Sequence, residues 1–164
     1  HVVIIGDDPE AVDEVVVRLL DPTYSDNPQG VRVVIIAQKR PGAIQARLSE
    51  HRVSAGLVTV LQADPGVESE LHRADVACAL SIILLPPTTE LTNDNTDDDE
   101  TASATIDKFG NQTVLLRRTI KRRHEVLAVQ CLRRVAPFVP VVVNCVSSLT
   151  RPLLLAAGAD AVFC

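Results

Sequence analysis

The sequence contains neither tryptophan nor methionine, and aromatic residues make up only 2% of its 164 residues. Its hydrophobic core must therefore be built from the aliphatic side chains that dominate its 46% apolar fraction. Such a composition is typical of strands that are buried on both faces between helices. The length is that of a single domain that can bury a sizeable core.

The sequence also lacks the roughly 18-residue apolar run that a membrane-spanning helix requires. Its longest apolar stretch, residues 76–87, fits a buried strand better. No signal peptide opens the chain, which begins directly on a strand-like segment without an initiator methionine. We therefore expect the sequence to be a fragment of a longer protein.

Neither an excess of positive charge nor a paired cysteine motif is present. The net charge is −5, which argues against a surface that binds nucleic acid. The cysteines and histidines show no C-x-x-C pair, zinc-ligand spacing or catalytic triad. Each cysteine lies in an apolar stretch, so we expect free, buried thiols in a reducing compartment. The four cysteines are Cys78, Cys131, Cys145 and Cys164.

Strand-like and helix-like segments alternate along the whole chain. Strands are expected at residues 2–5, 31–37, 57–63, 76–85, 139–146 and 160–164, and helices near 9–20, 42–53, 67–73, 112–136 and 148–157. Short, continuously apolar strands in this order predict a Rossmann-like, doubly wound α/β fold. We expect a six-stranded parallel sheet with helices on both faces.

Local signals mark the ends of two of these helices. Pro9 stands just inside the start of the first, with Asp8 as its expected N-cap. Gly158 follows the last where a C′ glycine belongs. The long helix has an expected core stripe of Leu116, Ile120, Leu127, Cys131 and Val135. Its basic block, Arg117, Arg118, Lys121, Arg122 and Arg123, is expected to be exposed.

Two polar stretches interrupt the alternation, a loop at residues 21–30 and an insertion at residues 86–111. The low hydrophobicity and dense negative charge of the insertion predict a flexible segment. Its carboxylates also offer the oxygen ligands that Ca²⁺ prefers, although no twelve-residue EF-hand frame surrounds them. A solvated loop and a cation site are both open interpretations. The carboxylates are those of Asp94, Asp97, Asp98, Asp99 and Glu100.

The first strand leads into an altered version of the dinucleotide-binding motif G-x-G-x-x-G/A. Gly6 and Ala11 fit the first and third positions, but Asp8 stands at the second, with Asp7 beside it. Two carboxylates at a helix N-terminus take the place of a phosphate and repel it. We therefore expect a closed cofactor site and a regulatory function, rather than redox catalysis.

Two other interpretations remain open. A soluble NAD(P)-dependent enzyme would need a ribose-binding group after the second strand, where residues 38–40 read Gln-Lys-Arg and suit a 2′-phosphate. A degenerate receiver domain would use Asp7 and Asp8 to hold Mg²⁺ beside a phosphorylated aspartate. The expected acceptor strand, residues 76–80, carries no carboxylate, so the receiver is the lesser alternative.

Taken together, four phrases resemble the regulator-of-conductance-of-potassium (RCK) domain, most closely that of large-conductance, calcium-activated potassium channels. They are residues 1–6 (His-Val-Val-Ile-Ile-Gly), 73–80 (Arg-Ala-Asp-Val-Ala-Cys-Ala-Leu), 139–143 (Val-Pro-Val-Val-Val) and 154–162 (Leu-Leu-Ala-Ala-Gly-Ala-Asp-Ala-Val). The resemblance covers almost the whole chain except residues 86–123, and makes residues 1–164 a single Rossmann lobe.

The resemblance implies a cytosolic gating domain of a membrane protein, without enzymatic activity. Its partners would be other RCK lobes in a homotetrameric gating ring and a pore domain in the same chain. No organic cofactor is implied, but acidic residues after the first helix bind Ca²⁺ in some members, where this chain has Asp21 and Asp26. A nucleotide-binding regulator of potassium transport is the related alternative.

Overall fold

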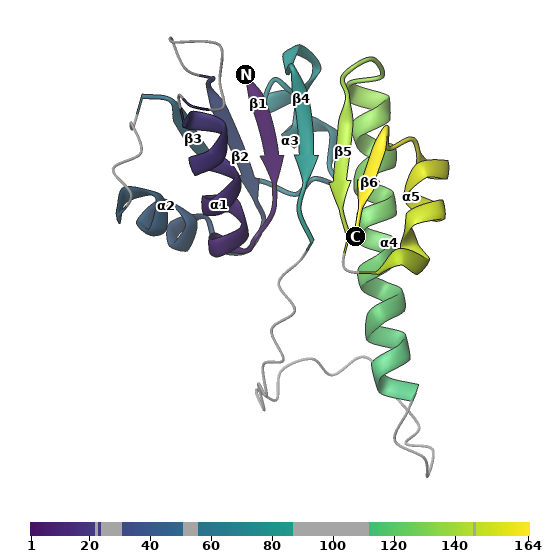
Figure 1. Cartoon of the computed structure of the whole chain (residues 1–164). Helices are drawn as coiled ribbons and strands as arrows, with labels where there is room; N and C mark the ends of the chain where they lie inside the picture. The colour runs from purple at the N-terminus through teal and green to yellow at the C-terminus, as the bar shows by residue number, and fades with distance from the viewer. Residues whose placement is uncertain (22, 24–30, 51–55, 87–111, 146) are drawn as a thin grey trace.

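The structure is a computed structural model that describes residues 1–21, 23, 31–50, 56–86, 112–145 and 147–164, with only the backbone for 112–123. Six parallel strands form one sheet in the order β3-β2-β1-β4-β5-β6 (Figure 1). The strands are β1 (Val2–Ile5), β2 (Val33–Ala37), β3 (Val58–Gln62), β4 (Ser81–Leu84), β5 (Val141–Asn144) and β6 (Ala161–Phe163). This architecture confirms the predicted Rossmann-like, doubly wound fold.

Helices connect the strands along the chain. The α-helices are α1 (Pro9–Leu20), α2 (Pro41–Glu50), α3 (Glu68–Arg73), α4 (Gln112–Val135) and α5 (Arg151–Ala157). Two short 3₁₀-helices are η1 (Val76–Cys78) and η2 (Ser148–Thr150). In the described part of the chain, no helix combines the length and the apolar character that a bilayer crossing would need.

Both faces of the sheet are buried, as the aliphatic composition predicts. All four residues of β1 are buried. Because side chains alternate along a strand, Val3 and Ile5 join one core and Val2 and Ile4 join the other. A fully apolar strand is what this position at the centre of the sheet requires.

The helices divide between the two faces (Figure 1). Val12 and Val16 of α1, together with Ile44 of α2, pack on the face that carries Ile4. The opposite face is covered by α3, α4 and α5. Their fully buried side chains there include Leu71, Leu132 and Leu154.

The predicted helix ends are confirmed. The Asp8 carboxylate accepts hydrogen bonds from the backbone N–H groups of Glu10 (3.0 Å) and Ala11 (3.4 Å) at the start of α1. Gly158 ends α5 in the left-handed conformation, with a φ of 111°. An added Cβ at this glycine would lie 2.8 Å from Cγ of Arg133, so both the backbone and the space favour glycine.

Two predicted elements are shorter than expected. The strand expected at residues 76–85 begins only at Ser81, because Val76–Cys78 form η1. Asp75 precedes η1 in the left-handed conformation, with a φ of 51°, which turns the chain away from an extended path. The helix expected at residues 148–157 is divided into η2 and α5.

The expected core stripe of α4 was wrong at Leu127, which is 52% exposed. Val135 is buried as predicted, and the other buried positions among the described side chains of α4 are Ala128, Val129 and Leu132. The core face of α4 therefore includes Ala128 and Leu132, each one position after Leu127 and the half-buried Cys131 of the predicted stripe. Leu116, Ile120 and the basic block lie outside the described side chains.

The cysteines are free in the described structure, but the expectation that all four are buried was wrong. Cys145 is buried and Cys131 is half-buried, whereas Cys78 and Cys164 are exposed. Cys78 and Cys164 lie where apolar stretches end. Cys78 is the last residue of η1, and Cys164 comes directly after the edge strand β6. Most of the loop at 21–30 and of the insertion at 86–111 lies outside the described residues.

Candidate functional site

The turn between β1 and α1 is the expected cofactor position, and Gly6 stands at its start. A Cβ added to Gly6 would lie 3.0 Å from Cβ of Leu85, which follows β4. The glycine thus allows the ends of β1 and β4 to approach closely. At this position a close contact within the protein accounts for the glycine.

The two aspartates of the turn bond to the protein's own backbone. Asp8 caps α1, so its carboxylate holds two of the N–H groups that a bound phosphate would use. Asp7 accepts a hydrogen bond from the backbone N–H of Lys39, just beyond β2, with an N–O distance of 2.8 Å. The turn is therefore already supplied with negative charge.

Polar side chains at the ends of β2 and β3 continue this arrangement. The Gln38 amide donates to the Asp64 carboxylate at 2.9 Å, and Gln62 donates to the backbone carbonyl of Gln38 at 3.5 Å. Asp64 also accepts from the backbone N–H of Gly66 at 2.8 Å, while Glu70 accepts from that of Asp64. These groups form an internal hydrogen-bond network along the carboxyl edge of the sheet.

Gln38 lies at a position that the sequence singles out, whereas no sequence motif marks Asp64 or Glu70. Their only signal was position, because Asp64 follows β3 and the carboxyl ends of parallel strands meet at one edge. Glu70 lies on α3 and reaches back to the same loop. Neither residue belongs to the glycine motif of the first turn.

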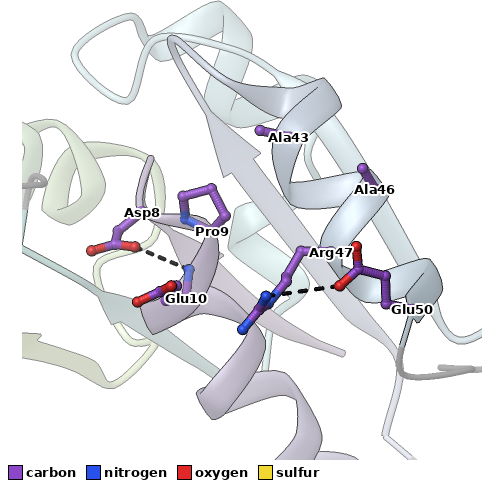
Figure 2. A pocket seen from close by; sticks show the side chains of 7 residues that line it. All are labelled: Asp8, Pro9, Glu10, Ala43, Ala46, Arg47 and Glu50. Carbon is purple, nitrogen blue, oxygen red and sulfur yellow. Dashed lines mark hydrogen bonds and ion pairs between the residues drawn. The ribbon is translucent and has the colours of Figure 1, made fainter.

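An open hollow of about 530 Å³ lies between the N-terminal part of α1 and α2 (Figure 2). It is lined by Asp8, Pro9, Glu10, Ala43, Ala46, Arg47 and Glu50. The lining therefore includes three carboxylates and one guanidinium. Arg47 is paired within the protein, to Glu50 at 3.7 Å and to the buried carboxylate of Asp13 at 3.8 Å. This charge balance does not favour an anionic ligand.

Of the candidate calcium ligands, only Asp21 is described. Its Oδ1 accepts hydrogen bonds from the backbone N–H (2.8 Å) and the hydroxyl (2.7 Å) of Thr23, and these bonds lower the pKa of Asp21. Among the described residues no group of three or more potential metal ligands occurs. The others, Asp26, Asp94, Asp97, Asp98, Asp99 and Glu100, lie outside the described residues.

The sheet order excludes the receiver-domain interpretation. Receiver domains have the strand order 2-1-3-4-5, whereas this sheet has 3-2-1-4-5-6. The segment 76–80, where the acceptor was sought, contains η1 and no strand. Asp7 and Asp8 therefore belong to a sheet whose strand order differs from that of receiver domains.

No protein-family model and no curated protein sequence matches the chain. Among solved structures, it is similar to the GsuK RCK domain, with 17% identity and a TM-score of 0.58, over 99% of this chain and 25% of that one. It is also similar to the GsuK channel bound to NAD, with 16% identity and a TM-score of 0.57, over 99% and 21% of the two chains.

A third similar structure is the TrkA-N domain of the inner membrane protein ybaL from Escherichia coli. It has 16% identity and a TM-score of 0.55, over 99% of this chain and 84% of that chain. Identities this low establish a shared fold, and the chain spans only a quarter of the GsuK RCK chain. The chain therefore has the Rossmann-like fold of RCK and TrkA-N domains.

Proposed function

We propose that this chain is a cytosolic regulatory domain of a potassium channel, in which it couples ligand binding and ring assembly to pore opening. The observation that carries the proposal is the similarity to the GsuK RCK domain over 99% of the chain. A closed first turn supports it, because Asp7 and Asp8 bond to the protein where a dehydrogenase would hold its cofactor.

The proposed partners are other copies of this domain in a homotetrameric gating ring, joined to a pore domain in the same longer chain. Exposed apolar side chains gather in the C-terminal part of the sequence, which supports a contact surface there. They are Leu127, Phe138, Leu149, Leu153, Leu155 and Phe163. Phe138 is 95% exposed, an arrangement that contact with a partner would stabilise by removing the ring from water.

The proposed mechanism needs no covalent chemistry. A regulatory domain acts when a ligand binds one ring conformation more tightly than another, and the difference in binding free energy shifts the population. The paired side chains of the first turn and of the edge network suit such a role, because they hold the loops at the ends of β1, β2 and β3 together. A ligand that changes one loop would then move the others.

Potassium flux through liposomes that contain the full-length polypeptide tests this proposal. We expect the wild-type polypeptide to conduct potassium. Leu153→Arg should change this flux, because a charge on the exposed face of α5 would disturb contacts between copies. Val17→Arg is the matched control, since Val17 is exposed on α1, away from the C-terminal part. Absence of potassium flux, or equal effects of both variants, would contradict the proposal.

A second candidate is a nucleotide-binding regulator of potassium transport, favoured by the GsuK structures solved with NAD and with ADP. Thermal unfolding with NAD(H), NADP(H), ADP and ATP separates it from the first, since binding to the native state raises the melting temperature. We expect no shift at sub-millimolar nucleotide, because the carboxylates repel phosphate. A saturable shift would favour the second candidate or an NAD(P)-dependent enzyme.

A further inference from the structure

Cys145 and Cys164 occupy matching positions at the ends of two neighbouring parallel strands. In the register of β5 and β6, Val143 pairs with Val162 and Asn144 pairs with Phe163. The next step pairs Cys145 with Cys164. A hydrogen bond of 2.8 Å from the backbone N–H of Cys145 to the carbonyl of Phe163 continues the ladder to this step.

This register brings the two thiols together. Residues paired in register on parallel strands project from the same face of the sheet, and neighbouring strands lie about 4.8 Å apart. That separation falls within the range of about 4.4–6.8 Å that disulfides span between Cα atoms. The Cys164 side chain is close enough to the Cys145 thiol to influence its pKa.

The two thiols differ in their access to solvent. Cys145 is only 3% exposed, and its thiol donates to the backbone carbonyl of Ser147 at 3.4 Å. Burial raises the pKa of this thiol, and the neighbouring Cys164 raises it further. Cys164 is exposed beyond the edge strand β6. A dissolved reagent can therefore reach Cys164 first, while Cys145 is placed to react with Cys164.

We propose that Cys145 and Cys164 form a dithiol site that a small-molecule disulfide, such as oxidised glutathione, converts to an intramolecular disulfide. The Cys164 thiolate attacks one glutathione sulfur and releases one glutathione thiolate, which takes up a proton. The Cys145 thiol then gives its proton to solvent, and its sulfur attacks that of Cys164 and releases the second glutathione. Two cysteines are oxidised, and one glutathione disulfide is reduced to two thiols.

The crosslink would act on the segment between the two strands. It would join β5 to the edge strand β6 and enclose η2 and α5 in a covalent loop. Leu149 and Leu153, which are exposed, lie within that loop. The inference stands on the strand register and is independent of the proposed channel function.

Mass spectrometry after treatment with oxidised glutathione tests the site. The parent is a Cys78→Ser/Cys131→Ser variant, which keeps only the proposed pair. We expect it to lose two hydrogen atoms, to retain no glutathione, and to regain its original mass after reduction. Peptide mapping should join the segments that contain Cys145 and Cys164. A series of reduced-to-oxidised glutathione ratios should give one reversible transition.

Single substitutions in the parent separate the roles of the two thiols. Cys145→Ala should retain one glutathione on Cys164, because the resolving thiol is absent. Cys164→Ser, which changes an exposed residue, should keep its mass and its native circular dichroism. The proposal would be overturned if the parent kept glutathione on Cys164 or formed covalent dimers. It would equally be overturned if Cys164→Ser acquired glutathione on the folded protein as readily as the parent reacts.

Discussion

The carboxylate of Asp7 accepts a hydrogen bond of 2.8 Å from the backbone N–H of Lys39. This bond joins the loop after β1 to the loop after β2, the two loops between which a Rossmann fold holds the ribose and pyrophosphate of a dinucleotide. Asp8 simultaneously caps α1. Asp8 therefore replaces interactions that a phosphate would otherwise make, and Asp7 holds the neighbouring loop with a second negative charge.

Removing both carboxylates should open this turn to phosphate. In the variant Asp7→Ser/Asp8→Gly, the N–H groups at the start of α1 are released, and the motif gains its second glycine. Glycine in place of an aspartate N-cap costs only about a few tenths of a kcal/mol, so the variant should fold. We expect ADP to raise the melting temperature of the variant and to leave that of the wild type unchanged.

Glu10→Gln is the matched control for this experiment, because it removes a carboxylate from the same helix turn and leaves the Asp8 cap in place. It should resemble the wild type. An ADP response in the control, or none in the double variant, would show that the two aspartates are not what closes the turn.

Asp160 should make stability depend on pH. Its carboxylate accepts a hydrogen bond from the backbone N–H of Val141 at 2.7 Å and pairs with Arg133. The Val141 bond, followed by Arg133, lowers the pKa of Asp160 below its usual 3.8. A lowered pKa contributes stability above the unfolded-state value, and that contribution is lost as the pH falls through the folded-state value.

The corresponding test is Asp160→Asn, measured by urea unfolding at several pH values. Because the side chain is 54% exposed, we expect a loss of only about 1 kcal/mol at neutral pH. The difference from wild type should begin to shrink below about pH 4, where the carboxylate of the unfolded state takes up its proton, and should vanish below the lowered folded-state pKa. A pH-independent difference would contradict the assigned charge effect.

Gly158→Ala should destabilise the domain by at least about 1 kcal/mol, since alanine at a positive φ is strained. Its Cβ would also lie 2.8 Å from Cγ of Arg133. Gly42→Ala is the matched control, because a Cβ at Gly42 meets nothing within 4 Å and Gly42 lies in α2. We expect the control to be neutral or slightly stabilised in thermal unfolding. If the two substitutions lowered the melting temperature equally, the left-handed conformation of Gly158 would not explain the loss of stability.

The sequence predicted the fold where local chemistry decides structure. The apolar strand at residues 2–5, the aspartate cap at Asp8 and the glycine at Gly158 are all short-range signals. The sequence did not predict features that depend on contacts with distant parts of the chain. The left-handed Asp75 precedes an apolar run that gives no sign of η1, and packing against the sheet leaves the large Leu127 of α4 exposed while it buries Ala128.

The site was predicted only in part for a related physical reason. The altered glycine motif is a local pattern, so Asp7 and Asp8 were found. The bond between Gln38 and Asp64 depends on the pairing of β2 with β3, which places residues 26 positions apart side by side. The pairing of Cys145 with Cys164 likewise depends on the register of β5 and β6, which no short motif records.

The polar insertion should be dispensable for folding. Replacing residues 88–111 with a short Gly/Ser linker removes few apolar side chains, and loop-closure entropy changes only slowly with length. We expect the free energy of unfolding to stay within about 1 kcal/mol of wild type in urea titrations. A loss of several kcal/mol would show that the insertion packs against the sheet.

Binding of Ca²⁺ to the acidic run should be weak. Five carboxylates between Asp94 and Glu100 repel one another, so a divalent cation relieves that repulsion and gains oxygen ligands. Ordering a segment without a preformed frame offsets much of this gain. We therefore expect a dissociation constant of about 0.1–1 mM, the range of low-affinity modules.

Calorimetry on the wild type and on Asp97→Asn/Asp98→Asn/Asp99→Asn measures this binding. The triple variant keeps the length and polarity of the segment and removes three charges, so its heat of binding should fall strongly. Asp21→Asn is the control, because the Asp21 carboxylate is held by Thr23 and should contribute little. Equal heats for the wild type and the triple variant would exclude the acidic run and leave Asp21 and Asp26 as the candidate calcium ligands.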